Sequence, residues 1–250
     1  MSGHSKWSTI KHKKAKADAA RGKLYTKLIR EIVVATREGG KDAEGNSRLR
    51  AAILTARNAN MPNDTVERAI KRGAGEIDGA SYEEVTYEGF GPGGVAFFIE
   101  ATTDNRNRTV AELRNLFHKR GGNLGTDGSV AWMFERKGVI RIDKEDTDFD
   151  RVFEAALEAG AADVTEDEAH YAISTEFTDL HDVSRALEAA GFAITEAKPV
   201  RIATTDVAVE GDVAEKILAI MELLDEHDDV SEVFTNADIS EEEMERLSAN

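Results

Sequence analysis

The sequence predicts an α+β protein, with an N-terminal three-helix domain followed by two ferredoxin-like α/β domains, one inserted in the other. Two observations lead to this prediction. Apolar residues recur at three- and four-residue spacing through the first 75 residues, whereas the rest of the chain alternates strand-like and helix-like segments. At 250 residues the chain is also long enough for two or three compact units.

The N-terminal part is expected to be helical. A first amphipathic helix is predicted over residues 18–38, and the glycine pair that follows ends it. Asn46 can cap a second helix, and a third is expected in the segment MPNDTVERAIKRGAG, which closes with two glycines. These three helices define a basic helical domain.

The remaining chain is expected to contain two ferredoxin-like units. Residues 137–204 have the complete βαββαβ order, and βαβ halves precede and follow them. In the two halves, strands are expected at residues 85–88, 95–102, 129–135, 206–209 and 230–234, with helices at 109–119 and 213–225. The expected domains are residues 1–76; 77–136 with 205–240; 137–204; and an acidic tail at 241–250.

Two motifs that could bind a cofactor or a metal are better explained by local structure. GFGPGG at residues 89–94 has dinucleotide-site spacing, but a strand follows it, so we expect a hairpin with positive φ angles. Asp146, Asp148 and Asp150 have calcium-loop spacing, but Arg151 replaces the turn glycine, so we expect acidic residues at a helix start. The histidines lack metal-ligand spacing. We therefore expect no enzyme activity, no cofactor and no metal.

The segment TDNRNRT at residues 103–109 has two compatible interpretations. Thr109 and Glu112 have the spacing of a capping box at a helix start. Arg106 and Arg108 could in addition provide a secondary anion contact there.

The sequence after this segment, HKRGGNLGTDGSVAW, also has basic residues at a helix end. His118, Lys119 and Arg120 could touch a phosphate, but cations are common where a helix ends before glycines. Trp132 is expected in the core.

Charge is unevenly distributed along this acidic chain. The net charge is −16, yet residues 1–75 contain 17 Lys and Arg against 7 Asp and Glu, and the remaining residues contain 15 against 41. Clustered cations repel one another, and a nucleic acid backbone is the common partner that offsets this repulsion. The charge pattern itself marks Lys6, Lys11, Lys13, Lys14, Lys16, Lys23, Lys27 and Arg30 as candidate phosphate contacts.

Composition also bears on location. The sequence has no apolar run of ~18–20 residues, no secretion signal and no cysteine. We therefore expect a cytoplasmic protein without a membrane partner.

Long segments of the sequence resemble the YebC/PmpR family. They include GHSKWSTIKHKKAKADAARGKLYTKLIREI, ANMPNDTVERAIKRGAG and TDNRNRTVAELRNLFHKRGGNLGTDGSVAW. The resemblance implies a three-domain cytoplasmic DNA-binding transcriptional regulator without catalytic residues, and it adds His12, Lys71 and Arg72 to the basic positions that match the family motif. Relatives of that family include a mitochondrial translational activator and bacterial members linked to ribosomes stalled on proline-rich sequences.

Two functions therefore stay open at the level of sequence. The first is a DNA-binding transcriptional regulator whose basic N-terminal lobe contacts the phosphates of duplex DNA. The alternative is a ribosome-associated translation factor that contacts ribosomal RNA, because backbone and shape contacts suit both polyanions. The acidic ferredoxin-like domains could also bind a protein partner.

Overall fold

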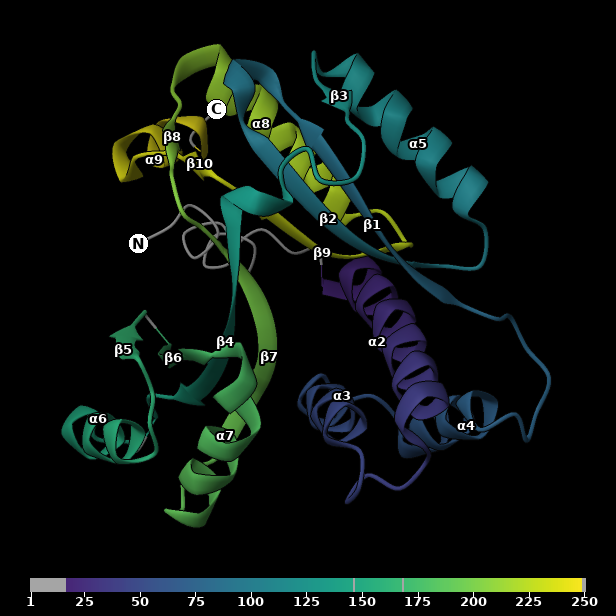
Figure 1. The fold of residues 1–250 in the computed structure, drawn as a ribbon, viewed down its shortest axis with the longest axis vertical. Coiled ribbons are helices and arrows are strands. Elements are labelled where there is room, and N and C mark those ends of the chain that lie inside the picture. The colour runs from purple at the N-terminus through teal and green to yellow at the C-terminus, as the bar shows by residue number, and fades with distance from the viewer. Residues whose placement is uncertain (1–16, 146, 168, 249–250) are drawn as a thin grey trace. The chain divides into compact units, whose positions relative to one another are not determined.

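The computed structural model describes residues 17–145, 147–167 and 169–248 (Figure 1). The chain divides into two compact units. The first contains the residues up to Arg30 together with 79–135 and 202–250, and the second contains 31–78 and 136–201. The α+β class is confirmed, whereas the predicted division into three domains stays a prediction. Within the described ranges, no helix combines the length and apolar character needed to cross a membrane.

The predicted N-terminal helices are present. Their bounds are α2 Ala17–Gly39, α3 Ser47–Asn58 and α4 Asn63–Gly73. Gly40 follows α2 with a φ of 86°, a conformation that glycine adopts without strain. Asn46 caps α3 as expected, because its side chain accepts a hydrogen bond of 3.0 Å from the backbone N–H of Leu49.

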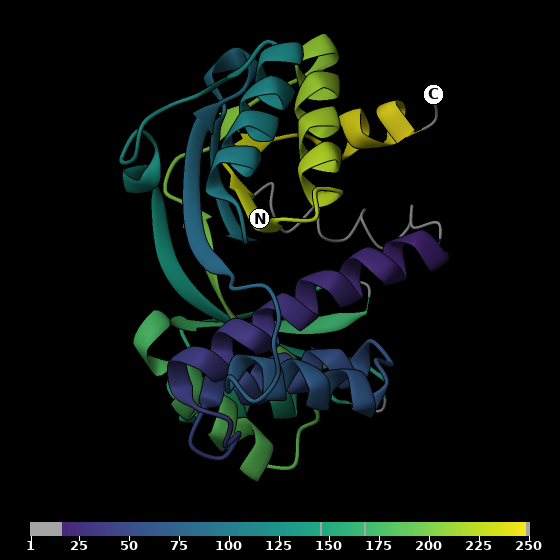
Figure 2. The same ribbon diagram turned by 90° about the vertical axis from the view of Figure 1, so that its right-hand side faces the viewer.

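The first unit is built on an antiparallel sheet with the strand order β3-β1-β2-β9. Figure 2 shows the two long helices of this unit, α5 and α8, on one face of that sheet. Between helices and sheet, Phe97 and Phe117 meet edge to face with ring centroids 5.4 Å apart. The elements are β1 Glu83–Phe90, β2 Ala96–Thr103, α5 Arg106–Lys119, β3 Asn123–Leu124, α8 Gly211–Asp225 and β9 Val230–Thr235.

The glycine-rich motif forms the expected hairpin. Strands β1 and β2 pair antiparallel, with Phe90 opposite Ala96, and the short 3-10 turn η1 (Pro92–Gly94) connects them. Gly93 and Gly94 have φ angles of 73° and 76°, which explains the glycines at these positions.

One predicted strand of this unit is wrong, and another is shorter than expected. Residues 129–135 form instead a loop, the 3-10 turn η2 (Ala131–Met133) and the start of β4 (Phe134–Asp143). The strand expected at 206–209 shortens to β8 (Val207–Ala208), which pairs in parallel with β10 (Ala237–Asp238). Strand β8 cannot join the main sheet beside β2, because β1 and β9 already occupy both edges of β2.

The second unit contains the predicted βαββαβ succession. Its strand order β5-β6-β4-β7, with the first and third strands at the centre, is the ferredoxin-like arrangement. Ile140, Ile173 and Leu187 are fully buried in its core. The elements after β4 are α6 Phe149–Glu158, β5 Asp163–Glu166, β6 His170–Glu176, η3 Phe177–Asp179, α7 Leu180–Ala189 and β7 Ile194–Ala203.

Two acidic segments lie at the start of helices, as was expected for the one near residue 148. Asp148 is the N-cap of α6 and accepts a 3.2 Å hydrogen bond from the N–H of Arg151. The acidic tail forms a short helix, α9 (Glu241–Ser248), with three glutamates in its first turn. Asp146 lies outside the described residues.

Candidate nucleic-acid interface

The positive charge of the N-terminal half is concentrated in residues 1–30, here called the basic segment. It contains nine Lys and Arg against one Asp, whereas residues 31–75 contain eight against six. The predicted contacts Lys6, Lys11, His12, Lys13, Lys14 and Lys16 lie outside the described residues, so their role stays a prediction.

The three remaining predicted contacts of the basic segment lie along α2 and meet an acidic turn. This turn, residues 225–229, connects α8 to β9. Lys23 Nζ lies 3.7 Å from a carboxylate oxygen of Glu226, and Lys27 Nζ donates a 2.8 Å hydrogen bond to the carbonyl oxygen of Asp225. Arg30 binds the same turn at Asp229. These three cations therefore have anionic or carbonyl partners within the first unit.

Asp229 is the centre of this contact, and its side chain is only 3% exposed. Its carboxylate accepts hydrogen bonds from Arg30 at 2.7 Å, from Arg108 at 2.8 Å and from the hydroxyl of Thr109 at 2.6 Å. Burial alone would raise the pKa of Asp229, but the hydrogen bonds from Thr109, Arg108 and Arg30 together lower it to about 2. Thr103 donates a fourth hydrogen bond to it at 3.2 Å, so Asp229 is a buried anion at neutral pH held by two arginines and two threonines.

Arg30 makes further bonds that fix α2 to this unit. Its Nη1 also donates to the carbonyl oxygens of Thr102 at 3.0 Å and Asp228 at 2.6 Å. The guanidinium lies 5.3 Å from the ring centroid of Tyr82, and the side chain is 12% exposed. Arg30 thus has a structural role in the first unit.

The segment 103–109 differs from the capping box expected there. Asn105 rather than Thr109 caps α5, by accepting a 3.1 Å hydrogen bond from the N–H of Arg108. Thr109 is fully buried, and its hydroxyl donates a hydrogen bond to Asp229. The two predicted secondary anion contacts are both exposed residues of α5. They differ because Arg108 is paired with Asp104 and Asp229.

The other predicted pair of basic residues lies at the end of α4. Lys71 is exposed, whereas Arg72 is half-buried. Both belong to the second unit, whereas Lys23, Lys27 and Arg30 belong to the first. The sequence groups these residues in one helical domain, which stays a prediction, whereas the division into two units falls within α2.

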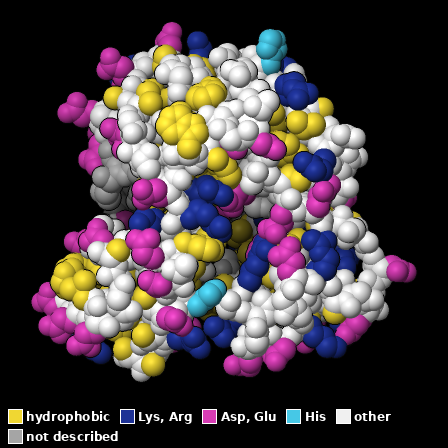
Figure 3. Space-filling view, in the orientation of Figure 1, with side chains coloured by type: hydrophobic (Ala, Val, Ile, Leu, Met, Phe, Trp, Pro, Cys, Tyr) yellow, Lys and Arg dark blue, Asp and Glu magenta, His cyan; other side chains and the backbone are white. Residues whose placement is uncertain are grey.

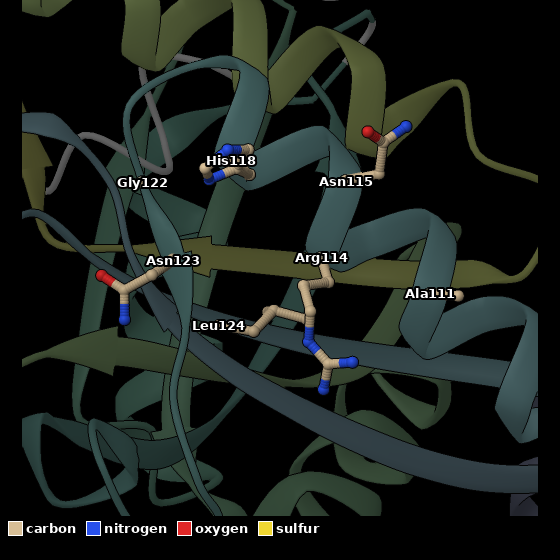
Figure 4. A pocket seen from close by; sticks show the side chains of 7 residues that line it. All are labelled: Ala111, Arg114, Asn115, His118, Gly122, Asn123 and Leu124. Atoms are coloured by element: carbon tan, nitrogen blue, oxygen red, sulfur yellow. The ribbon is translucent and has the colours of Figure 1, made fainter.

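A groove with a volume of about 480 Å³ lies between α5 and β3, and of its lining residues the sequence singled out only His118, as a possible phosphate contact. Its lining residues are Ala111, Arg114, Asn115 and His118 of α5 together with Gly122, Asn123 and Leu124. In Figure 4 the Leu124 side chain extends toward Arg114, whereas the side chains of Asn115 and Asn123 point away from the gap on opposite sides. The sequence signal for Arg114 was its i, i+4 spacing from His118, which places both side chains on one face of the helix.

Trp132, which we expected in the core, is 72% exposed. The loop before it is held by buried Glu88, whose carboxylate accepts hydrogen bonds from the N–H groups of Gly128, Val130 and Ala131 at 2.6–2.8 Å. The indole N–H donates to the carbonyl oxygen of Ser129 at 3.2 Å, so Trp132 is presented outward by an ordered loop.

One group of side chains has the proximity of a metal site but not its chemistry. One potential ligand atom from each of Glu112, His227 and Asp229 lies within 4.8 Å of the others. Nδ1 of His227 accepts the N–H of Asp229 at 3.1 Å, so Nε2 carries the proton and donates to Glu112 at 3.0 Å. Asp229 already binds two arginines. A cation would have to displace all of these bonds, so the group is better explained as an ion-pair network.

Comparison with known proteins gives matches over nearly the whole chain. Residues 5–76 match the family model described as the TACO1/YebC protein N-terminal domain, and residues 82–237 match that of the TACO1/YebC second and third domain. A probable transcriptional regulatory protein of Acidithiobacillus ferrooxidans is 57% identical over 249 residues, covering 100% of this chain and 99% of that protein. One of Geobacter sulfurreducens is 55% identical over 247 residues, covering 99% and 100%.

A solved structure is also similar. The crystal structure of a conserved hypothetical protein from Aquifex aeolicus matches with a TM-score of 0.85 and 48% sequence identity. The match covers 91% of this chain and 94% of that one.

Proposed function

We propose that this chain, which belongs to the TACO1/YebC family, is a regulator of gene expression that binds duplex DNA. In this proposal the basic segment contacts the phosphates of the duplex. The names of its bacterial relatives, probable transcriptional regulatory proteins, support the regulatory role. The observation that carries the nucleic-acid partner is the charge of the basic segment, with nine cations against one anion in an otherwise acidic chain.

Not every predicted cation is equally suited to this role. Arg30 holds Asp229, so a phosphate would have to compete with a buried carboxylate for it. The side chain of Lys23 is 41% exposed and lies 3.7 Å from Glu226, a separation at which an exposed pair contributes little. Phosphate contact is therefore assigned to the lysines of the basic segment other than Lys27, which is bonded to the carbonyl oxygen of Asp225, and not to Arg30. The contacts predicted for His12, Lys71, Arg72 and Arg106 stay part of the proposal.

The test is the salt dependence of duplex binding by the full chain. Changing four lysines to Gln should weaken binding and reduce the slope of log affinity against log salt by about 0.9 for each phosphate that the variant no longer neutralises. The substituted positions are Lys11, Lys13, Lys14 and Lys16.

A matched control removes the same charge elsewhere. Its four Gln substitutions are at Lys41, Lys144, Lys198 and Lys216, which lie outside the basic segment. If the two variants bind a duplex equally well and with equal slopes, the basic segment is not the binding surface.

The translation alternative is separated by a different measurement. A ribosome-associated factor should migrate with ribosomes when a cell lysate is sedimented through a sucrose gradient, and the four-lysine variant should lose this co-migration. A wild-type protein absent from ribosomal fractions that still binds duplex DNA would support the transcriptional role.

The proposal includes four further predictions from the sequence. They are a three-domain division at the boundaries given above, a cytoplasmic location, action without catalysis, and a possible protein partner for the acidic ferredoxin-like domains.

A further inference from the structure

Helix α6 of the second unit carries three large apolar side chains on its outer side. Phe149, Phe153 and Leu157 are spaced four residues apart, so they form one row along the helix, here called the apolar ridge. Their exposed fractions are 36%, 36% and 48%, although the same helix buries Val152 and Ala156 in the core. Large apolar side chains that are exposed together, rather than singly, are typical of an interaction surface.

The apolar ridge is held in place from the sheet and lies on the side of α6 away from α7. The ring centroid of Phe149 is 5.6 Å from that of Tyr171 in β6 and 5.7 Å from that of Phe153. Arg151 points to the other side, where its guanidinium carbon lies 5.7 Å from the ring centroid of Phe192, which follows α7. The ridge is therefore an ordered surface, and packing within the unit leaves its outer side exposed.

A row of carboxylates runs beside the apolar ridge. Asp150, Glu154 and Glu158 each follow a member of the ridge by one residue, and all three are exposed. Within the described ranges, no ion pair or side-chain hydrogen bond neutralises any of them. Like charges four residues apart on a helix repel each other, so a cationic partner on this face would relieve the repulsion.

The charge of the wider surface limits what can bind there. Residues 143–168, which include α6, contain eleven Asp and Glu against two Lys and Arg. In Figure 3, yellow hydrophobic side chains lie among magenta Asp and Glu at the lower left, over the region of α6. Such a surface repels nucleic acids and anionic membranes, and it attracts a partner that is both basic and apolar.

We propose that the apolar ridge is a docking site for a basic amphipathic helix of another protein. A row of side chains at i, i+4 and i+8 packs into the groove between the rows of a facing helix, so a helix fits its shape. Apolar residues of the partner cover Phe153 and Leu157, and its lysines or arginines pair with Glu154 and Glu158. The inference rests on the part of the proposed function that gives the acidic domains a protein partner.

The experiment measures binding of a labelled peptide to the full chain by fluorescence anisotropy. The peptide consists of leucine and lysine, is about 18 residues long, and has its leucines at i, i+3, i+4 and i+7 spacing. A second peptide has the same composition, but its leucines are distributed all round the helix. The first peptide should bind more tightly than the second, and its affinity should fall as the salt concentration rises.

Two substitutions remove apolar surface without changing the charge. Leu157→Ser should weaken binding of the amphipathic peptide by about fivefold and Phe153→Ser by about tenfold, because the peptide then buries less apolar area. Phe153 also contacts Phe149, so if Phe153→Ser lowers the thermal midpoint, the more exposed Leu157 carries the test. The matched control is Leu223→Ser, at an exposed leucine of the acidic helix α8, which should bind the peptide like the wild type.

The contribution of charge is tested by removing two carboxylates. Glu154→Gln combined with Glu158→Gln should weaken binding by about threefold or more and reduce its salt dependence, because two ion pairs with the peptide are lost. Glu241→Gln combined with Glu242→Gln removes the same charge from the exposed first turn of α9 and should leave binding unchanged.

Several results would overturn the proposal. They are no binding of the amphipathic peptide by the wild type, equal binding of the two peptides, equal effects of Leu157→Ser and Leu223→Ser, and equal effects of the two glutamate variants. Self-association of the wild type that Leu157→Ser abolishes would also overturn it, because the ridge would then bind a second copy of the chain.

This site and the basic segment can fail separately. The four-lysine variant should bind the amphipathic peptide like the wild type, and Leu157→Ser should bind duplex DNA like the wild type. Loss of duplex binding with intact peptide binding therefore contradicts only the role of the basic segment, and the reverse result contradicts only the docking site.

Discussion

Replacing Asp229 with Asn should destabilise the first unit in a way that depends on pH. The substitution removes the anion that binds Arg30 and Arg108 while keeping nearly the same side-chain volume. The pKa of Asp229 falls from 3.8 to about 2 on folding. At 1.36 kcal/mol per pKa unit, this corresponds to about 2 kcal/mol of folding free energy at neutral pH.

The full effect should exceed this value. Arg30 is 12% exposed and would keep only carbonyl partners, so part of the cost of an uncompensated buried charge is added. Arg108 is 41% exposed and can reach water, which limits that cost. We expect a total loss of roughly 2–4 kcal/mol, or a Tm lower by roughly 4–16 °C for a chain of this size.

The pH dependence has a definite sign. Because the folded pKa lies below the unfolded value, the stabilisation by Asp229 is complete above about pH 5 and is lost as the pH falls toward 2. The free energy of unfolding, measured by circular dichroism in urea at several pH values, should therefore differ most between wild type and D229N at pH 7. The difference should shrink between pH 5 and pH 2.

Asp228→Asn is the matched control for this experiment. Asp228 lies in the same acidic turn, is exposed, and bonds Arg30 only through its backbone carbonyl. Its substitution should change stability by less than about 0.5 kcal/mol. The reasoning is refuted if D229N and D228N are equally stable, or if the D229N deficit stays constant down to pH 2.

Two further substitutions test packing and loop order. Glu88→Gln should lower stability by roughly 1–3 kcal/mol, because an amide offers one acceptor oxygen where the carboxylate offers two. The remaining oxygen can keep the bonds from Val130 and Ala131, which share one carboxylate oxygen, so the N–H of Gly128 should exchange faster in hydrogen-exchange experiments. Gly73→Ala should lower the free energy of unfolding in urea by roughly 1–3 kcal/mol, because the added Cβ would overlap the carbonyl oxygen of Val33 and the side chain of Thr36. Unchanged stability would show that α2 and α4 can separate freely.

Features encoded by nearby residues could be predicted from the sequence. Helix α2 runs from Ala17 to Gly39, against an expected 18–38, because its apolar periodicity and the glycine pair after it are local signals. The glycine hairpin and the βαββαβ order of the second unit have equally local causes in turn residues and alternating patterns. Strand β3 was missed because two residues carry no periodicity.

Features that depend on distant partners could not be predicted in this way. Glu88 lies in a strand and is buried because three N–H groups about 40 residues later close over its carboxylate. Trp132 illustrates the reverse error, since a large aromatic residue usually indicates core but here stands on the outside of that loop. Arg30 and Asp229 are 199 residues apart in the chain, and no local pattern links them.

The contact between α2 and the acidic turn explains why a cationic stripe can mislead. A helix face with cations at three- and four-residue spacing predicts an anionic surface opposite it, but the spacing does not say whether that surface belongs to another molecule. In this chain the acidic turn at residues 225–229 binds Lys27 and Arg30 internally, and the buried carboxylate of Asp229 meets Arg30, whose side chain is only 12% exposed. Charge that is already neutralised within the fold releases few counterions on binding a polyanion and therefore adds little to its salt dependence. The slope for duplex binding should accordingly fall when lysines before α2 are replaced. Arg30→Lys should lower the Tm while leaving that slope nearly unchanged, because a lysine has no planar guanidinium to bind Asp229 and lie against the ring of Tyr82 at the same time.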